Sequence, residues 1–246
     1  MGILDSSPSP RRTMVLFFIV DTSGSMFGSK IGSVNQAIRE VLPMMDDISS
    51  SNADAEIKIA VLRFSSGCEW AYSEPKSASE FRWVDFEADG LTDLGAAYLE
   101  LNNKLSRDAF MQTATGSFAP VLLLLTDGDP TDDYQSGLKK LKENKWYKAS
   151  IKIAIAIGSD ANKEVLKDFT NSLEAVIEVH NVEALKKLIR TVSVTASTIG
   201  SQSSTANKDK QTQVVDTIKT EVEKTDGAST ADAPVTSSAS DDDEWA

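Results

Sequence analysis

A short polar loop follows the first strongly apolar run of the chain. The stretch reads FFIVDTSGSM, and it places Asp21, Ser23 and Ser25 at alternate positions directly after the apolar residues. A carboxylate and two hydroxyls at this spacing suit four kinds of chemistry: a helix cap, a phosphate-binding loop, an attacking nucleophile and a metal shell. The rest of the sequence weighs these four against one another.

The first two interpretations explain little of the pattern. A helix cap accounts for one of the three residues, and we expect the next helix to begin only near Ser29. A P-loop needs four residues between its glycines and a lysine directly after the second. Here Gly24 and Gly28 enclose three residues, and Ser29 separates Gly28 from Lys30. The phosphate-binding interpretation is therefore disfavoured.

The nucleophile interpretation lacks an activating base. A catalytic serine needs a neighbouring base, and the chain has a single histidine, His180, at the end of a late strand. An aspartyl phosphatase would need a second aspartate where Ser23 stands. We therefore expect a protein that is not an enzyme, and keep as the alternative a metal-dependent phosphohydrolase that uses Asp21 or Asp127.

The metal shell explains most of the pattern. Two more segments carry oxygen ligands: GLTDLG contains Thr92 at the opening of a helix, and LLTDGDPTDD contains Asp127 directly after a buried strand. Ligand sites of open parallel sheets form beyond the carboxyl ends of the strands. If the strands before Asp21 and Asp127 are neighbours, the two carboxylates emerge side by side. Hydroxyl and carboxylate oxygens suit a hard divalent cation, and we expect Mg²⁺, with Mn²⁺ or Ca²⁺ as alternatives.

The elements that must position these residues alternate between strands and helices. Continuous apolar runs predict buried strands at residues 14–20, 121–125 and 151–158, and a further strand at 55–64. Helical spacing of apolar residues predicts helices at 30–45, 92–105, 134–147 and 182–194. This order predicts an α/β fold with a mostly parallel sheet that is covered on both faces.

The same motifs carry a family resemblance. The run DTSGS, with GLTDLG and LLTDGDPTDD downstream, resembles the metal-ion-dependent adhesion site of von Willebrand factor A domains, and the order of elements matches over residues 13–195. The resemblance implies a three-layer, doubly wound, Rossmann-like fold. Its mostly parallel six-stranded sheet would have the strand order 3-2-1-4-5-6 and one antiparallel edge strand.

The resemblance also implies roles for individual residues. Ser23 and Ser25 would bind the metal directly, Thr92 directly or through water, and Asp21 and Asp127 largely through water. An open metal position would bind an Asp or Glu side chain of a protein partner. The partner-binding rim would include residues that flank these ligands: Met26, Asp93, Asp129 and Asp132.

Within that family the chain is most similar to bacterial TerY-type proteins, which are associated with tellurite resistance and stress response. Such proteins often occur beside a protein kinase and a PP2C-type phosphatase, so the resemblance implies an assembly of that kind. The alternative function is that of an extracellular adhesin.

Composition narrows the partners and the compartment. The net charge of −12, without a Lys- or Arg-rich cluster, argues against nucleic-acid binding. The apolar stretch 14–20 is too short to span a membrane, and no secretory signal is evident. Cys68 is the only cysteine, so no internal disulfide forms. We expect a cytoplasmic protein without membrane contact.

The ends of the chain differ from its centre. We expect residues 1–12 to be a disordered lead, residues 13–199 to form the domain, and residues 200–246 to be a disordered acidic tail rich in Ser and Thr. Apolar residues in the tail have the spacing of a short helix near 211–224. A further hypothesis is that the terminal DDDEWA reaches back and competes for the metal.

Overall fold

The computed structural model describes residues 11–113, 116–202, 209–233 and 245. The strands are β1 (Arg12–Asp21), β2 (Ala55–Ser65), β3 (Gly67–Trp70), β4 (Lys76–Ser77), β5 (Val121–Thr126), β6 (Ile151–Ile157), β7 (Val176–Val179) and β8 (Ala228–Thr230). The α-helices are α1 (Ser29–Ser51), α2 (Leu94–Lys104), α3 (Tyr134–Glu143), α4 (Lys145–Ala149), α5 (Lys163–Thr170), α6 (Val182–Gly200) and α7 (Lys210–Val222). Two short 3-10 turns complete the set: η1 (Gly24–Met26) and η2 (Leu173–Ala175).

Across the described residues the strands form one eight-stranded sheet. Its order is β3-β2-β1-β5-β6-β7-β8, and β4 also pairs with β2. The five central strands run parallel, whereas β3, β4 and β8 are antiparallel to their neighbours. The predicted α/β class and the predicted order of six strands are confirmed. The sheet differs from the prediction in having antiparallel strands at both edges, because β8 comes from the segment that was expected to be a tail.

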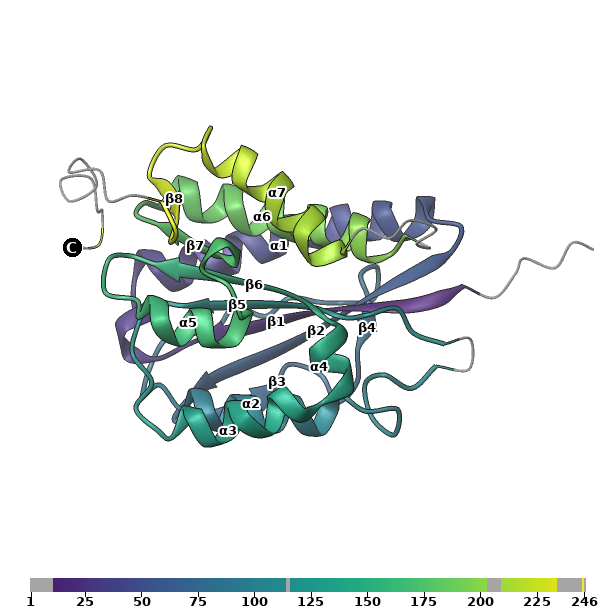
Figure 1. Ribbon diagram of the computed structural model, residues 1–246, viewed down its shortest axis with the longest axis horizontal. Helices are drawn as coiled ribbons and strands as arrows, with labels where there is room; N and C mark the ends of the chain where they lie inside the picture. The colour runs from purple at the N-terminus through teal and green to yellow at the C-terminus, as the bar shows by residue number, and fades with distance from the viewer. Residues whose placement is uncertain (1–10, 114–115, 203–208, 234–244, 246) are drawn as a thin grey trace, which may run out of the picture.

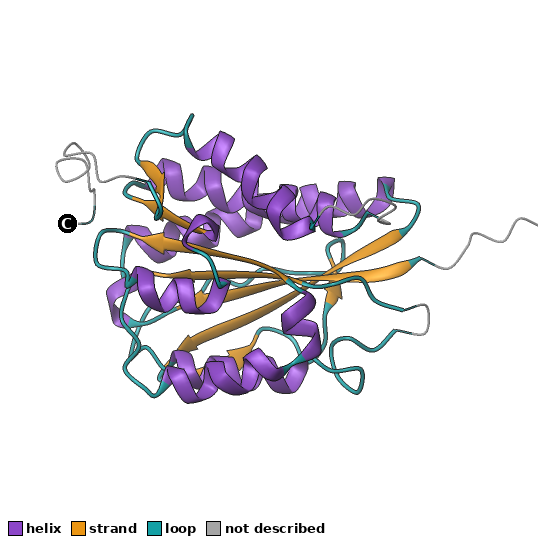
Figure 2. Cartoon of the chain, viewed as in Figure 1, coloured by secondary structure: helices purple, strands orange, loops and turns teal. Residues whose placement is uncertain are grey.

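Helices cover both faces of the sheet and make a three-layer architecture (Figures 1 and 2). Alternate residues of β1 point to opposite faces. Leu16 and Phe18 join the core beneath α1, α6 and α7. Phe17 and Ile19 join the core beneath α2, α3 and α5. Burial on both faces explains why β1 reads as a continuous apolar run rather than an alternating one.

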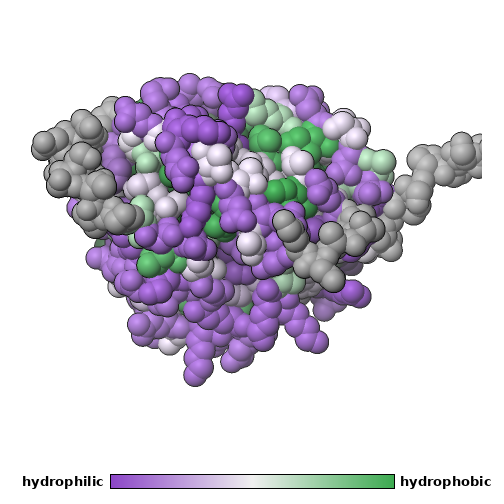
Figure 3. All heavy atoms as spheres, turned by 45° about the horizontal axis from the view of Figure 1, so that its top comes forward, coloured by the Kyte–Doolittle hydropathy of each residue, from purple (hydrophilic) through white to green (hydrophobic). Residues whose placement is uncertain are grey.

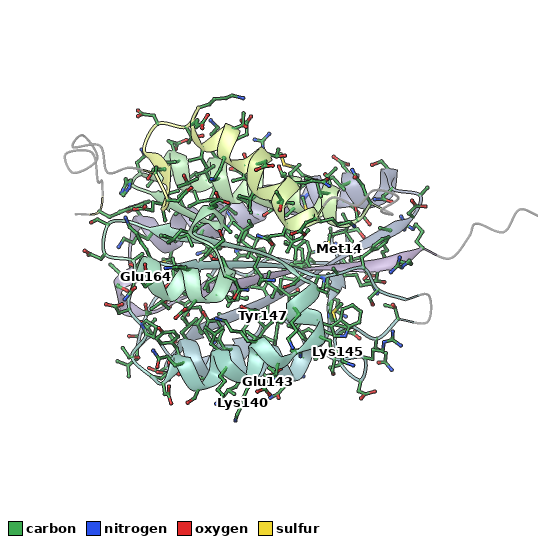
Figure 4. The ribbon with its side chains drawn as sticks, viewed as in Figure 1. Met14, Lys140, Glu143, Lys145, Tyr147 and Glu164 are labelled. Atoms are coloured by element: carbon green, nitrogen blue, oxygen red, sulfur yellow. The ribbon has the colours of Figure 1, made fainter. Side chains whose placement is uncertain are left out.

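The outer faces of the helices are polar. In Figure 4, Tyr147 lies between the sheet and α3, whereas Lys140 and Glu143 lie on the outer side of α3. Tyr147 is 1% exposed, and its hydroxyl donates to the carbonyl of Phe169. Figure 3 shows a largely hydrophilic surface with scattered apolar areas over the side of the molecule that carries α7. Among the described residues, no helix combines the length and the apolar character needed to cross a membrane.

The prediction of a disordered tail over residues 200–246 is wrong for residues 209–233. Helix α7 lies within the range where the sequence allowed a short helix, and its apolar side chains Val214, Val215, Ile218 and Val222 are at most 6% exposed. The side-chain amide of Gln211 pairs with both backbone groups of Lys152, at 2.8 and 2.9 Å. The polar composition was misleading because four apolar residues on one helix face can bury themselves against an existing domain.

We predict that Ile218→Asp destabilises the domain by about 3–5 kcal/mol, because it places an unpaired charge among buried side chains. Thr217→Asp on the exposed face of the same helix serves as the matched control, with a change within about 0.5 kcal/mol. Urea unfolding followed by circular dichroism measures both. Equal stability of the two variants would show that α7 does not pack on the domain.

Candidate metal centre

The candidate site lies where β1 and β5 end. These strands are hydrogen-bonded neighbours in the middle of the sheet, with Val20 opposite Leu125. Figure 1 shows β1 and β5 side by side in the sheet. Asp21 and Asp127 therefore leave the sheet next to each other, at the same carboxyl edge. This is the position at which open parallel sheets build ligand sites, because loops from several strands converge there.

A chain of hydrogen bonds joins the predicted ligands. The hydroxyl of Thr126 and the backbone N–H of Ser23 donate to the two carboxylate oxygens of Asp21. The hydroxyl oxygens of Ser23 and Ser25 are 3.1 Å apart, and Ser25 Oγ donates to Asp127 Oδ1 at 2.7 Å. The structure thus brings four of the five predicted ligands into one connected group of oxygens.

Backbone contacts place the fifth predicted ligand, Thr92, against both loops. Gly24 donates its N–H to the carbonyl of Gly90 at 3.1 Å, which joins the loop before α2 to the loop after β1. Thr131 donates its N–H to the carbonyl of Thr92 at 2.9 Å, which joins the same segment to the loop after β5. Thr92 is 6% exposed, and within the described residues its hydroxyl makes no hydrogen bond. That hydroxyl is free to bind a ligand.

The donor set fits a hard divalent cation. The group combines the carboxylates of Asp21 and Asp127 with the hydroxyls of Ser23, Ser25 and Thr92. The described residues contain no cluster of three or more His, Cys, Asp or Glu side chains that would suit a metal. Any ion held here would depend on neutral hydroxyl oxygens, which suit Mg²⁺, Mn²⁺ or Ca²⁺.

Burial makes the site unfavourable for negative charge. Asp21 is fully buried, and burial raises the pKa of its carboxyl. The charge of Asp127 raises the pKa of Asp21 further, whereas hydrogen bonds from Thr126 and Ser23 lower it. A cation beside these two carboxylates would relieve the cost of holding them close together.

Lys30 lies against this group and was missed as a site residue. Its Nζ is 2.7 Å from Asp127 Oδ2, and the two side chains are 13% and 0% exposed. The sequence analysis considered Lys30 only as the lysine of a phosphate-binding loop. That interpretation was disfavoured by the spacing of the glycines. Its position in the first turn of α1, directly after the serine loop, was the signal that could have found it.

The predicted rim needs one correction. Met26 is 0% exposed and belongs to the core beneath α1, because η1 turns its side chain inward. Its placement on a partner-binding surface is therefore wrong. Two apolar residues that the sequence did not single out occupy the surface instead: Phe27 is 79% exposed and Leu91 is 56% exposed.

The acidic members of the predicted rim make structural contacts. Asp132 accepts the backbone N–H groups of Gly95 and Ala96 at the start of α2. Asp93 accepts the N–H of Gly67 at 2.8 Å. Asp129 is exposed, and it accepts a hydrogen bond from the side-chain amide of Asn162 at 2.6 Å. Asp93 and Asp132 thus fix the start of α2 and the backbone around Thr92, whereas Asp129 faces solvent.

Two other sequence predictions concern residues outside the group. His180 follows β7, which β6 separates from β5, so it lies away from the two aspartates. Of the terminal DDDEWA only Trp245 is described, and its Nε1 donates to the hydroxyl of Ser29 at 2.9 Å. Its four acidic residues lie outside the described residues, so competition for the metal stays a prediction.

Comparisons with known proteins identify a family for the central part of the chain. Residues 16–191 match the von Willebrand factor type A domain. A search of curated proteins finds no match.

Solved structures share the fold at low sequence identity. A von Willebrand factor type A protein from Catenulispora acidiphila superposes with a TM-score of 0.56 at 17% identity, covering 76% of this chain and 43% of that one. Proximal thread matrix protein 1 from the mussel byssus, with a zinc-occupied MIDAS motif, superposes with a TM-score of 0.57 at 15% identity. The match covers 76% of this chain and 48% of that one. The pilus adhesin SpaC from Lactobacillus rhamnosus GG superposes with a TM-score of 0.61 at 13% identity. The match covers 77% of this chain and 30% of that one. This chain thus matches less than half the length of each structure.

The approach of α2 to α3 holds the loops in place, and we predict that Gly95→Ala disturbs it. A Cβ at Gly95 would lie 2.6 Å from the backbone oxygen of Asp133, so the variant should lose about 1–3 kcal/mol of stability. Gly32→Ala in α1 is the control: a Cβ there meets nothing within 4 Å, and the change should be neutral or stabilising by up to about 1 kcal/mol. Chemical denaturation measures both, and a neutral Gly95→Ala would contradict the close packing.

Proposed function

The chain belongs to the von Willebrand factor type A domain family, and on this premise we propose that it is a Mg²⁺-dependent protein-binding module. Domains of this family often mediate protein interactions through a metal-ion-dependent adhesion site. Here Ser23, Ser25 and Thr92 would hold the ion by their hydroxyls. Asp21 and Asp127 would act largely through water.

The observation that carries the proposal is the connected group of oxygens at the ends of β1 and β5. Residues separated by about a hundred positions in the chain are in hydrogen-bond contact there, as in the pair of Ser25 and Asp127 at 2.7 Å. When bound, a divalent ion supplies concentrated positive charge on a shell of mainly neutral oxygens. An acidic side chain of a partner is the natural external ligand of such a site, because charge-assisted contacts of this kind are strong and directional.

Two exposed apolar side chains flank the group and complete the proposed contact surface. Phe27 follows η1 in the loop after β1, and Leu91 immediately precedes Thr92. The hydrogen bond between Gly24 and Gly90 joins the two loops that carry them. We infer that the partner presents a carboxylate with apolar residues beside it. Apolar contacts would then supply affinity, while the carboxylate supplies direction.

The cellular context follows from the TerY-type resemblance alone. We propose a cytoplasmic role in a bacterial stress-response assembly, including tellurite resistance, with a protein kinase and a PP2C-type phosphatase as candidate partners. Mn²⁺ or Ca²⁺ remain alternatives to Mg²⁺, because the oxygen donors accept each of these ions.

We also propose that the domain does not catalyse a reaction. An aspartyl phosphatase that uses Asp21 would need a second carboxyl group two positions further on, and Ser23 stands there instead. Hydrolysis of p-nitrophenyl phosphate in Mg²⁺ tests this directly. Turnover that disappears in Asp21→Asn would support the enzymatic alternative, and absence of turnover supports the binding module.

We predict that Thr92→Ala weakens Mg²⁺ binding at least tenfold, which corresponds to about 1.4 kcal/mol. The fold should be unaffected, because the lost hydroxyl has no hydrogen bond within the described residues. Titration calorimetry measures the affinity, and thermal melting checks the fold. Thr191→Ala on α6 is the control and should bind Mg²⁺ like the parent protein.

The same variant tests partner binding. Capture of a partner from the native host should require Mg²⁺, and Thr92→Ala should lose it. Unchanged capture in EDTA would count against a metal-dependent interaction. Failure of the parent protein to take up Mg²⁺, Mn²⁺ or Ca²⁺ both alone and with the captured partner would remove the metal from the proposal.

We predict that Phe27→Ser and Leu91→Ser each weaken binding of the captured partner by roughly 10- to 100-fold, because burial of such a side chain contributes about 1.5–3 kcal/mol. Val84→Ser is the matched control: Val84 is 74% exposed, and it lines a separate hollow with Tyr72 and Trp83 that contains neither Phe27 nor Leu91. Mg²⁺ affinity should be the same in all three variants. Equal partner affinity in all three would exclude Phe27 and Leu91 from the interface.

A further inference from the structure

Lys30 is a cation held directly against a candidate metal ligand. It is the second residue of α1, and its Nζ pairs with Asp127 Oδ2 at 2.7 Å. The pair is largely shielded from water, since the side chains of Lys30 and Asp127 are 13% and 0% exposed. An ion pair in this setting is screened much less than one on the surface.

Asp127 needs this partner when no metal is bound. A buried carboxylate is costly unless it is paired and hydrogen-bonded. Ser25 donates to Oδ1 of Asp127, and Lys30 pairs with Oδ2, so both oxygens are engaged. The pair therefore lets the domain fold with Asp127 charged and buried.

The same contact opposes metal binding. Ser25 is both a proposed metal ligand and the hydrogen-bond donor to the carboxylate that holds Lys30. A cation held by Ser25 would have to share the carboxylate of Asp127 with the ammonium of Lys30. Two positive charges that share one shielded carboxylate repel each other.

The net charge of the site changes with each ligand. Asp21, Asp127 and Lys30 carry formal charges of −1, −1 and +1, a sum of −1. A divalent cation changes that sum to +1, and a carboxylate from a partner brings it to zero. The state with metal and without partner thus carries surplus positive charge that Lys30 contributes.

We propose that Lys30 is a built-in competitor of the divalent ion, which stabilises the metal-free domain and makes metal retention depend on the partner. This regulation rests on the proposed function, since it concerns the same site. By linkage, a partner whose carboxylate offsets the positive charge tightens metal binding by the factor by which metal tightens partner binding. Lys30 thereby couples the two ligands.

The first test is the affinity for metal alone. Titration calorimetry with MgCl₂, repeated with MnCl₂, should give a dissociation constant at least tenfold lower for Lys30→Met than for the parent protein. Arg39→Met is the matched control: it removes the same charge from α1, where Arg39 pairs with the exposed Asp85. Its metal affinity should equal that of the parent.

The second test is stability without metal. In EDTA, Lys30→Met should melt roughly 5 °C or more below the parent, because Asp127 loses its counter-charge. Mg²⁺ should raise its melting temperature by more than it raises that of the parent. Lys30→Gln keeps an N–H donor for Asp127 without the charge, and it replaces Lys30→Met in both tests if the latter does not fold.

The outcomes separate this inference from the proposed function. Metal binding by the parent with equal or weaker binding by Lys30→Met would overturn the competition and assign Lys30 to the orientation of Asp127. If Lys30→Met binds metal and the parent protein does not, the competition is supported. If neither the parent protein nor any variant binds Mg²⁺ or Mn²⁺, the inference and the proposed metal site are both overturned.

Discussion

The buried carboxylate of Asp21 is the constraint on which the rest of the site depends. It stands at the end of a strand whose side chains are buried on both faces, so it has no access to bulk water. A carboxylate in that position must find hydrogen bonds within the protein. It receives one from the backbone of Ser23, which fixes the path of the serine loop, and one from Thr126, which ties that loop to β5. The geometry of the other oxygens follows from these two bonds.

The surrounding elements complete this arrangement by contacts to the backbone of the loops. Gly90 accepts from Gly24, and Thr92 accepts from Thr131, so that the segment before α2 bridges the loops after β1 and β5. Asp132 binds the first N–H groups of α2, and Gly95 lets α2 approach the loop before α3. The hydroxyl of Thr92 is thereby held in place and makes no hydrogen bond to the part of the chain that the structure describes, as a ligand position requires.

With and without the proposed divalent ion, the site would carry net charges of opposite sign. The charge of the chain is strongly negative, and the metal-free group shares that sign once Lys30 is counted. A divalent ion reverses the sign locally, so an acidic partner would be repelled in one state and attracted in the other. The exposed side chains of Phe27 and Leu91 are uncharged, so the apolar contact that they offer does not depend on the sign of the site.

The fold class and the three segments that meet at the site could be predicted from the amino-acid sequence, whereas the order of the strands came from the family resemblance that those segments carry. Apolar runs that stop at Asp21 and at Asp127 mark the ends of buried strands, and such runs depend only on local periodicity. The directions of Met26 and Phe27 depend instead on tertiary structure, because a single 3-10 turn sends one side chain inward and the next outward. The pairing of Lys30 with Asp127 is likewise tertiary, since it joins two residues 97 positions apart. Helix α7 is ordered by the surface that it covers, which composition cannot show, because its burial depends on residues elsewhere in the chain.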